Sequence, residues 1–338
     1  MSEEAGDIAD AALTTRPSQT RCGVVAILGA PNAGKSTLVN HLVGAKVSIV
    51  TQKVQTTRAR VRGIAVEAGA DGAAVQLVYI DTPGIFAPRR TLDRAMVQAA
   101  WEGAEGADAT VLMVDAPSYV AAGEEGGTKR EGAAARRAAE DTDRIIDGLK
   151  AQGRKAILVL NKIDLIPAPP LLKLTERLNE HGVFTDTFLI SAQKGRGTDD
   201  LKAHLAGLMP EGPFLYPEDQ LSDISDRLMA AEVTREKLFL RLHQEIPYSL
   251  TVETEEWGRT KKNELRIGQA IYVERDSQKA LVLGRGGKTI SAVGKAAREE
   301  LTDLLGETVH LKLFVKVRDK WAEDAERLRG LGLEGLPR

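Results

Sequence analysis

The chain has 338 residues, which is more than one compact domain usually holds, so its length predicts two domains. Hydrophobic residues make up 43% and charged residues 28%, which excludes disorder throughout, and the single cysteine, Cys22, excludes an internal disulfide or a multi-cysteine zinc site. The 46 basic and 48 acidic residues give a net charge of −2, so only a local basic patch can argue for nucleic acid. The start lacks the features of a signal peptide and no apolar run reaches the roughly 18 residues of a membrane span, so we expect a cytoplasmic protein without a spanning segment.

The N-terminal part of the chain alternates short apolar runs with amphipathic stretches of helical length. Residues 1–20 precede this pattern, lack apolar periodicity and are expected to form a disordered tail. Strands that are apolar on both faces and alternate with helices predict a mostly parallel sheet with helices on both faces. We therefore expect an α/β domain over residues 21–209. Its predicted strands are residues 22–28, 75–80, 109–114, 156–160 and 187–190.

Two stretches depart from this pattern. Residues 116–141 are polar, contain glycine and have few large apolar side chains, so we expect a surface insertion with a helical end. Residues 210–222 contain three prolines and are expected to be a linker. A smaller α+β domain is expected over residues 223–332. Its predicted parts are a helix within 224–246, strands at 249–252 and 265–273, a glycine turn at 284–287, a helix at 288–305, a strand at 310–317 and a closing helix.

The sequence GAPNAGKST follows the first predicted strand, precedes a stretch of helical pattern and matches GxxxxGK[ST]. Gly29 and Gly34 allow backbone N–H groups to turn inward around a phosphate at the start of a helix. Lys35 is expected to bridge the β- and γ-phosphates, and Ser36 to hold Mg²⁺. The strand before the motif and the helix after it disfavour a chance glycine turn. The predicted nucleotide-binding residues of this loop are Gly29, Ala30, Pro31, Asn32, Ala33, Gly34, Lys35, Ser36 and Thr37.

A second motif, NKID, stands at the end of the predicted strand 156–160. The carboxylate of Asp164 can accept hydrogen bonds from N1–H and the exocyclic amine of guanine, whereas adenine offers no such donor pair. Asn161 is expected to brace the loop and the stem of Lys162 to cover the base. NKxD is a common tetrapeptide, so its weight comes from its placement and from SAQK downstream, where Ser191 and Ala192 are expected to close the pocket.

Two motifs between these are typical of nucleotide-dependent switches. DTPG contributes Asp81, Thr82, Pro83 and Gly84; Asp81 is expected to hold Mg²⁺ through water, and the Gly84 N–H to sense the γ-phosphate. In QTTR, residues 55–58, a threonine can complete the Mg²⁺ shell, and Thr57 is favoured over Thr56. The predicted metal ligands are thus Ser36, Thr57 and Asp81, and the predicted catalytic residues are Lys35, Thr57 and Gly84.

In this order the motifs resemble the TRAFAC class of GTPases, and together with a second domain that carries a glycine turn they resemble the Era family over roughly residues 21–332. The resemblance implies a P-loop GTPase domain that uses GTP/GDP and Mg²⁺. It places Ile85 where Ras-like enzymes carry a water-orienting glutamine, so we expect slow intrinsic hydrolysis that needs a partner or a bound K⁺. In related GTPases an asparagine at the position of Asn32 accompanies K⁺ activation; a simple turn residue is the alternative.

The second domain carries GRGG at residues 284–287, a GxxG loop that lets a phosphate approach bare N–H groups at a helix start. Residues 275–298 hold six basic side chains against one acid, which favours a phosphate-facing surface. The flanking residues 245–257 and 310–333 resemble the type II KH domain of the Era family. The predicted RNA-binding residues are Lys279, Gly284, Arg285, Gly286, Gly287, Lys288 and Lys295. Either an RNA groove or ordinary helix packing explains Leu281, Val282, Ile290 and Val293.

The resemblance implies a GTP-hydrolysing switch that binds single-stranded 16S rRNA near its 3′ end and assists maturation of the 30S subunit, coupling ribosome assembly to growth. A membrane-associated signalling or cell-cycle GTPase is the alternative. In that case the KH-like domain docks on a protein or on lipid at the inner face of the membrane, which the basic patch also suits. A third hypothesis, an RNA-binding module with a purely structural nucleotide domain, is disfavoured by the complete phosphate and magnesium set.

Overall fold

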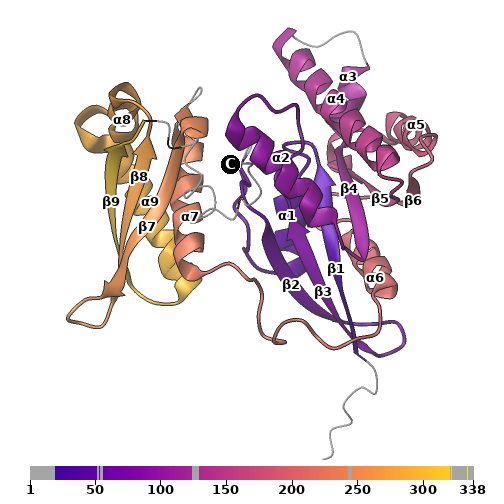
Figure 1. Ribbon diagram of the computed structural model, residues 1–338, viewed down its shortest axis with the longest axis horizontal. Coiled ribbons are helices and arrows are strands. Elements are labelled where there is room, and N and C mark those ends of the chain that lie inside the picture. The colour runs from indigo at the N-terminus through magenta and orange to yellow at the C-terminus, as the bar shows by residue number, and fades with distance from the viewer. Residues whose placement is uncertain are drawn as a thin grey trace, which may run out of the picture.

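The computed structural model describes residues 20–51, 53, 56–123, 129–242, 246–319, 321 and 333, and these form an N-terminal and a C-terminal lobe (Figure 1). Of the expected disordered tail, only Thr20 lies within the described residues, where it begins the first strand. Gln55 of QTTR falls outside them, as does the expected closing helix apart from Trp321 and Leu333.

A six-stranded sheet forms the N-terminal lobe, with strand order β2-β3-β1-β4-β5-β6. All neighbouring pairs are parallel except β2 with β3, so the predicted mostly parallel sheet is confirmed. The antiparallel edge strand β2 was not predicted. Its strands are β1 (Thr20–Gly29), β2 (Val61–Ala68), β3 (Ala74–Asp81), β4 (Ala109–Asp115), β5 (Ala156–Asn161) and β6 (Phe184–Leu189).

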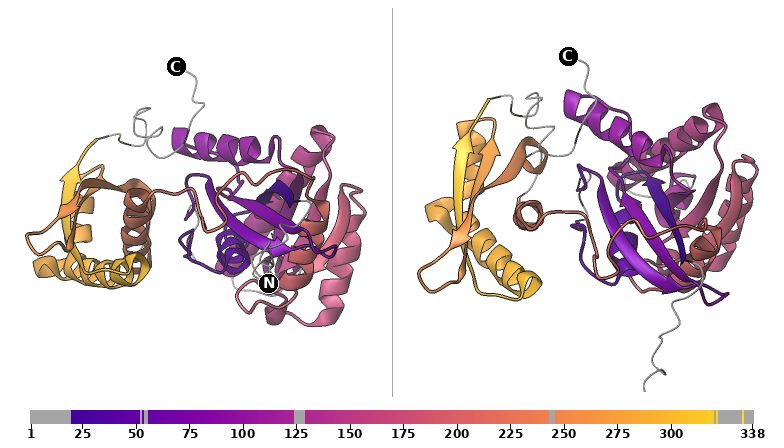
Figure 2. Two further views of the ribbon diagram at one scale, coloured as in Figure 1. Left: turned by 90° about the horizontal axis from the view of Figure 1, so that it is seen from below. Right: turned by 60° about the horizontal axis from the view of Figure 1, so that its bottom comes forward.

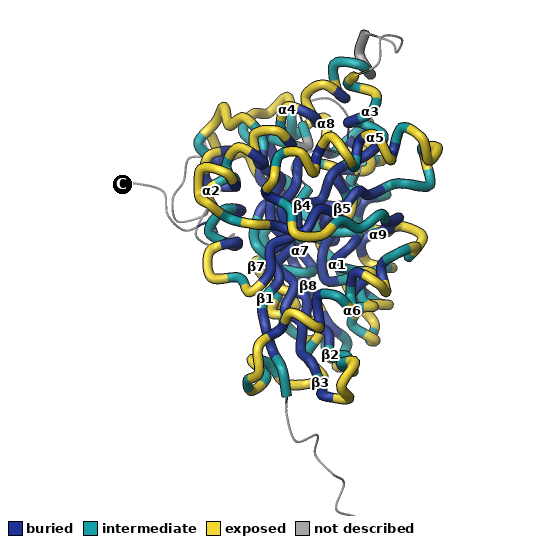
Figure 3. The backbone as a smooth tube through the Cα atoms, turned by 90° about the vertical axis from the view of Figure 1, so that its right-hand side faces the viewer, coloured by how far each residue is buried: buried dark blue, intermediate teal, exposed yellow. Residues whose placement is uncertain are grey.

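Helices cover both faces of this sheet, as expected. Alternate residues of β1 point to opposite faces. Val25 and Ile27 join a core with α1 and α6, whereas Ala26 and Leu28 join a second core with α2, α4 and α5. The burial pattern in Figure 3 follows this arrangement, with the central strands dark blue. The helices are α1 (Lys35–Val43), α2 (Thr91–Ala104), α3 (Ala116–Ala122), α4 (Lys129–Ala151), α5 (Ala168–Asn179) and α6 (Thr198–Leu208).

Residues 116–141, expected as a surface insertion with a helical end, are more regular than that. Helix α3 follows β4 directly, and α4 covers the expected helical end. Ala116, Tyr119 and Ala139 are buried in the core against the sheet, so this part of the stretch belongs to the domain's packing. The sequence obscured this because alanine, which is small enough for close packing, carries most of the contact.

The proline-rich stretch 210–222 has no helix or strand, but it is bonded along the sheet. Cys22 N donates to Pro210 O (3.1 Å), Ile64 N donates to Leu221 O (2.9 Å), and Ser222 forms a bridge with Gly63 of β2. The contacts at Gly63 and Ile64 satisfy part of the edge that β2 would otherwise leave open, whereas the bond at Cys22 is to β1. The connection between the lobes is therefore attached to the strand that follows QTTR.

The C-terminal lobe is a three-stranded sheet with order β7-β8-β9 and helices packed on one face. β7 and β8 are antiparallel, and β8 and β9 are parallel. β7 is longer than the predicted strand, and α8 was not predicted. Figure 2 shows α7 as the helix of this lobe beside the N-terminal lobe. The elements are α7 (Asp226–Arg241), β7 (Leu250–Arg259), β8 (Leu265–Val273), α8 (Asp276–Leu283), α9 (Lys288–Leu305) and β9 (Val309–Val317).

The four apolar side chains near GRGG, Leu281, Val282, Ile290 and Val293, differ in how far they are buried. Val282 and Val293 have no exposed surface and pack in the core with Ile271, so groove lining is excluded for them. Ile290 packs partly against this core, whereas Leu281 is 54% exposed. In the part of the chain that the structure describes, no helix is long and apolar enough to cross a membrane.

A buried polar pair joins α7 to β8: Thr234 Oγ1 donates to Gln269 Oε1 at 2.6 Å, and both residues are fully buried. Thr234→Val removes the donor and leaves the amide oxygen unpaired. We expect it to lower the free energy of unfolding by about 1–3 kcal/mol in chemical denaturation. Thr302→Val on the outer part of α9 is the matched control, and an equal loss there would contradict the assigned role of the pair.

Candidate functional site

The phosphate loop, residues 29–37, lies between β1 and the first turn of α1. Its glycines are required by contact. A Cβ on Gly34 would lie 2.3 Å from Asn161 Nδ2, and one on Gly29 would lie 2.5 Å from Met113 O. Asn32 adopts the left-handed conformation with φ 64°, which asparagine tolerates better than most residues. This conformation supports the interpretation of Asn32 as a turn residue. The association of Asn32 with K⁺ activation stays a prediction.

Lys35 lies inside this loop with 6% of its surface exposed. Its Nζ donates to Gly29 O and Ala30 O, both at 3.1 Å. Burial lowers the pKa of Lys35 to about 8, and the charge of Asp81 opposes that shift. A buried ammonium held by carbonyls alone is a ready partner for an anion, because burial of an unpaired charge is costly.

Three oxygen-bearing side chains converge beside Lys35. Ser36 Oγ lies 2.8 Å from Thr57 Oγ1, and Thr57 Oγ1 donates to Asp81 Oδ2 at 3.4 Å. Asp81 is fully buried, and its Oδ1 has no hydrogen-bond partner among the described residues. Burial raises the pKa of Asp81, against the lowering effect of hydroxyl hydrogen bonds and of Lys35. One carboxylate and two hydroxyls fit Mg²⁺, which binds few protein oxygens and takes the rest from phosphate and water.

The structure also separates the two candidate threonines of QTTR. Thr56 Oγ1 lies 2.6 Å from Thr51 Oγ1 and donates to Lys53 O at 2.7 Å. Of the two, Thr57 is the threonine that reaches Ser36, and its role as a magnesium ligand stays a prediction.

The DTPG turn packs directly on the phosphate loop. A Cβ on Gly84 would lie 2.9 Å from Pro31 N, so only glycine allows this approach. Ile85 N donates to Gly29 O at 3.2 Å, and the Ile85 side chain is 1% exposed in the sheet core. Ile85 is therefore both apolar and turned into the core, and it cannot orient a water molecule.

The NKID and SAQK segments meet beside the phosphate loop. Asn161 Nδ2 donates to Ala33 O at 2.8 Å, and Ala192 N donates to Asn161 Oδ1 at 2.9 Å, so this one amide braces both loops. The Asp164 carboxylate lies 3.0 Å from Lys194 Nζ. Hydrogen bonds from Ser191 and Lys194 lower its pKa, which keeps Asp164 an ionised acceptor near neutral pH.

Sequence reasoning missed a partner of Lys162. Its Nζ donates to Asn32 O at 2.8 Å and to Asp115 Oδ2 at 2.6 Å. Asp115 Oδ1 also accepts from Ser118 N at 3.2 Å and so caps α3. A signal was present, because Asp115 is the polar residue that ends the buried strand β4, at the edge where the other motifs lie.

The GRGG loop lies between α8 and α9 on the C-terminal lobe, away from the phosphate loop (Figure 1). Gly284, Gly286 and Gly287 all have positive φ, and a Cβ on Gly284 would lie 2.1 Å from Thr289 Oγ1. No side chain caps the start of α9, so its first N–H groups are available to an anion. Arg285, Lys288 and Lys295 are exposed around it, and Lys279 is half-buried.

Fold and sites together define a P-loop nucleotide hydrolase domain followed by a KH domain. The family model "50S ribosome-binding GTPase" matches residues 24–162, and the KH domain model matches residues 245–322. GTPase Era of Caulobacter vibrioides strain NA1000 is 53% identical over 322 residues, covering 95% of this chain and 99% of the relative. GTPase Era of Brucella suis biovar 1 is 52% identical over 320 residues, covering 95% and 96%.

Two solved structures are similar over nearly their whole length. An Aquifex aeolicus Era variant bound to GDP.AlF4⁻ has a TM-score of 0.79, and an Era complex with MgGDPNP and nucleotides 1506–1542 of 16S ribosomal RNA has 0.78. Each is 36% identical and covers 93% of this chain and 99% of its own. The chain belongs to the Era family of GTPases, and it hydrolyses GTP.

Asn161→Ala removes the amide that braces the phosphate loop and the SAQK segment. We expect the two unpaired backbone groups to cost about 1–3 kcal/mol, which is roughly a 5- to 150-fold loss of guanine-nucleotide affinity. Equilibrium titration with a fluorescent GDP analogue measures the loss. Asn179→Ala, an exposed asparagine at the end of α5, is the control, and unchanged affinity in the Asn161 variant would refute the bracing role.

Proposed function

We propose that this GTPase binds single-stranded RNA at the 3′ end of 16S rRNA and assists maturation of the 30S ribosomal subunit in the cytoplasm. The observation that carries the proposal is the presence, in one chain, of a nucleotide-switch site and of a GxxG loop with uncapped helix N–H groups among exposed basic side chains. The similar Era structure in complex with 16S rRNA nucleotides supports the choice of RNA.

In GTP hydrolysis the oxygen of water bonds to the γ-phosphorus while the bond from that phosphorus to the β–γ bridging oxygen breaks, which gives GDP, inorganic phosphate and a proton. The glycine-rich backbone from Gly29 to Gly34 cradles the phosphates, and Lys35 brings its positive charge to the β- and γ-phosphates. Ser36, Thr57 and Asp81 would hold Mg²⁺, which neutralises charge on the phosphate oxygens when bound. The Gly84 turn lies against the phosphate loop and is suited to respond to the γ-phosphate.

We propose that the intrinsic rate is slow because the side chain after DTPG is buried. Ile85 has 1% exposed surface, so no group at this position activates the attacking water. Activation of the attacking water then depends on RNA, a protein partner or K⁺. Of these we favour RNA, because its binding on one lobe would be linked to hydrolysis on the other. GTP hydrolysis then serves as a timer whose rate depends on the bound target.

Guanine selection is assigned to Asp164. Asp164→Asn replaces one carboxylate oxygen by an amide NH₂, which opposes the exocyclic 2-amine of guanine but can donate to the 2-carbonyl of xanthine. We expect GTP affinity to fall by at least about 100-fold and XTP affinity to rise, as measured by competition binding. Asp186→Asn on β6 is the control. Unaltered GTP preference in the Asp164 variant would sink the assignment of base recognition.

The RNA proposal is tested with Arg285→Ala/Lys288→Ala at the GRGG loop. We expect weaker binding to a 3′ fragment of 16S rRNA, with the salt-dependence slope reduced by about 0.7 for each lost phosphate contact. GTP hydrolysis without RNA should be unchanged, and its stimulation by the fragment should disappear, in K⁺ and in Na⁺ buffer alike.

Arg266→Ala, an exposed arginine on β8, is the matched control and should bind RNA normally. Vesicles of anionic phospholipid form the second arm. If the unmodified protein binds these vesicles and not the RNA fragment, the function lies with the peripheral membrane alternative.

A further inference from the structure

We propose that Arg235 of α7 is a positioning residue for the nucleotide site on the other lobe. It holds the backbone carbonyl of Thr56 and thereby keeps Thr57 beside Ser36 and Asp81. The inference rests on the role of Thr57 as a magnesium ligand, which is part of the function proposed above. It goes further in assigning part of that site to the RNA-binding lobe.

Arg235 lies between the lobes with 2% of its side chain exposed. Its Nη2 donates to Thr56 O, and its Nε donates to Glu232 Oε1 at 2.8 Å. The guanidinium also lies over the Phe239 ring, 5.1 Å from the centroid. Glu232 offsets the charge of this buried guanidinium, and Nε and Nη2 are bonded, whereas Nη1 has no hydrogen-bond partner among the described residues.

The contact is transmitted through one peptide unit. The Thr56 carbonyl and the Thr57 nitrogen share a rigid plane, so fixing the carbonyl also fixes the start of Thr57. The Thr57 side chain then reaches Ser36 Oγ at 2.8 Å. A loss of the Arg235 bond therefore acts on the oxygen cluster without touching any of its ligands.

The surrounding switch segment, residues 50–60, has no helix or strand among its described residues. Besides the bonds of Thr57 to Ser36 and Asp81, several of its anchors come from the C-terminal lobe. Lys53 Nζ donates to Phe239 O and Leu242 O at the end of α7, and Val50 N donates to Glu236 Oε1 at 2.9 Å. Without a ladder of its own, the segment depends on these bonds for its conformation.

Arg58 adds an anchor on the far side of Thr57. Its Nη1 donates to Leu250 O at 2.7 Å, and its guanidinium lies 5.5 Å from the ring centroid of Trp321. Thr57 therefore lies between two residues that are each bonded to the C-terminal lobe.

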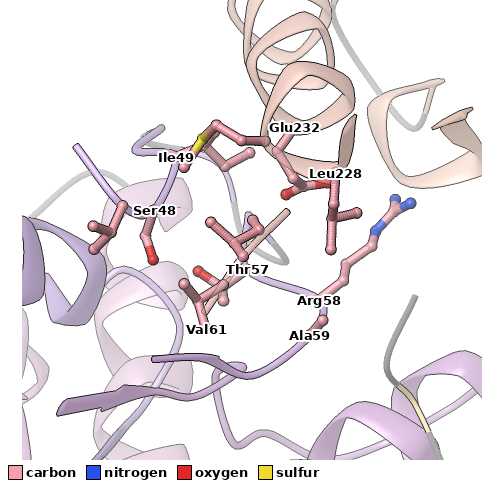
Figure 4. Close-up of a pocket in the computed structure, with 11 residues that line it drawn as sticks. Ser48, Ile49, Thr57, Arg58, Ala59, Val61, Leu228 and Glu232 are labelled. Carbon is pink, nitrogen blue, oxygen red and sulfur yellow. The ribbon is translucent and has the colours of Figure 1, made fainter. Parts of the chain in front are cut away.

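Apolar packing between the switch segment and α7 is incomplete. Figure 4 shows a pocket with Thr57, Ala59 and Val61 on one side and Leu228 and Glu232, which descend from α7, on the other. Because the pocket interrupts the apolar contact, the polar bonds carry more of the positioning. A further contact between the lobes, from outside this segment, reaches α9, the helix that begins at the GRGG loop: Lys46 bonds both Glu236 and Glu300.

The test compares Arg235→Met, which keeps a long side chain over Phe239 but loses the donors, with Arg227→Met. Arg227 is the matched control because it lies on the same helix and donates to Thr254 O within its own lobe. The first measurement is the Mg²⁺ concentration that half-maximally retains a fluorescent, non-hydrolysable GTP analogue. We expect a rise of about tenfold for Arg235→Met, corresponding to about 1.4 kcal/mol, and no change for the control.

Hydrogen exchange of peptides over residues 56–62 gives a readout independent of activity. It should be faster in Arg235→Met, while analogue affinity without Mg²⁺ stays as in the unmodified protein. Normal exchange and a normal Mg²⁺ requirement in Arg235→Met would overturn the inference.

Thr57→Ala separates this inference from the proposed function. If Thr57→Ala leaves the Mg²⁺ requirement unchanged, the proposed metal role of Thr57 fails, and the positioning role fails with it. If Thr57→Ala raises the Mg²⁺ requirement and Arg235→Met does not, the positioning role of Arg235 is wrong and the metal role of Thr57 stands. The double variant Arg235→Met/Thr57→Ala excludes a general loss of folding. If Arg235 acts through Thr57, the Mg²⁺ requirement of the double variant equals that of Thr57→Ala alone. If Arg235→Met causes an unrelated structural defect, the two effects on the Mg²⁺ requirement add.

Discussion

The parallel arrangement of the four central strands is the constraint on which the rest of the molecule depends. In a parallel sheet all carboxyl ends lie at one edge, where ligands bind. The strand register shows this alignment: Ile27 is opposite Asp81, Gly29 is opposite Met113, and Asp115 is opposite Asn161. The phosphate loop, DTPG, Asp115 and NKID, which are far apart in the chain, therefore lie together at this edge.

The segments at this edge lie so close together that only glycine fits at residues 34 and 84. The charged groups of Lys35 and Asp81 are buried there. The Asn161 amide fills the space that a side chain at residue 34 would need, and Pro31 fills that at residue 84. Lys35 and Asp81 are both buried, and burial shifts both of their pKa values toward the neutral form. Polyphosphate with a divalent cation would bring charges of both signs to Lys35 and Asp81, so the burial of these two groups favours binding of such a ligand.

Much of this site was predictable because it is encoded locally. The phosphate loop, DTPG and NKID each follow a buried strand, and the strand order of a parallel sheet then brings them together. β2 was missed because Val61–Ala68 mixes Arg62, Gly63 and Glu67 with its apolar residues, as an edge strand can. α8 was missed because its eight residues are too few to show a helical period. The error over residues 116–141 arose because buried alanines resemble solvent-facing ones in sequence.

The contacts between the lobes could not be predicted from any local pattern. Arg58 and Arg235 are 177 residues apart, and each looks in sequence like an ordinary surface charge. Their burial follows from contacts with the opposite lobe: Arg235 on α7 bonds Thr56 O, and Arg58 bonds Leu250 O at the start of β7. A segment with no ladder of its own takes its shape from whatever binds it on each side. Here one side is the phosphate loop, through the bond of Thr57 to Ser36, and the other is the C-terminal lobe, through the bond of Arg235 to Thr56 O, so the proposed positioning of Thr57 depends on both lobes.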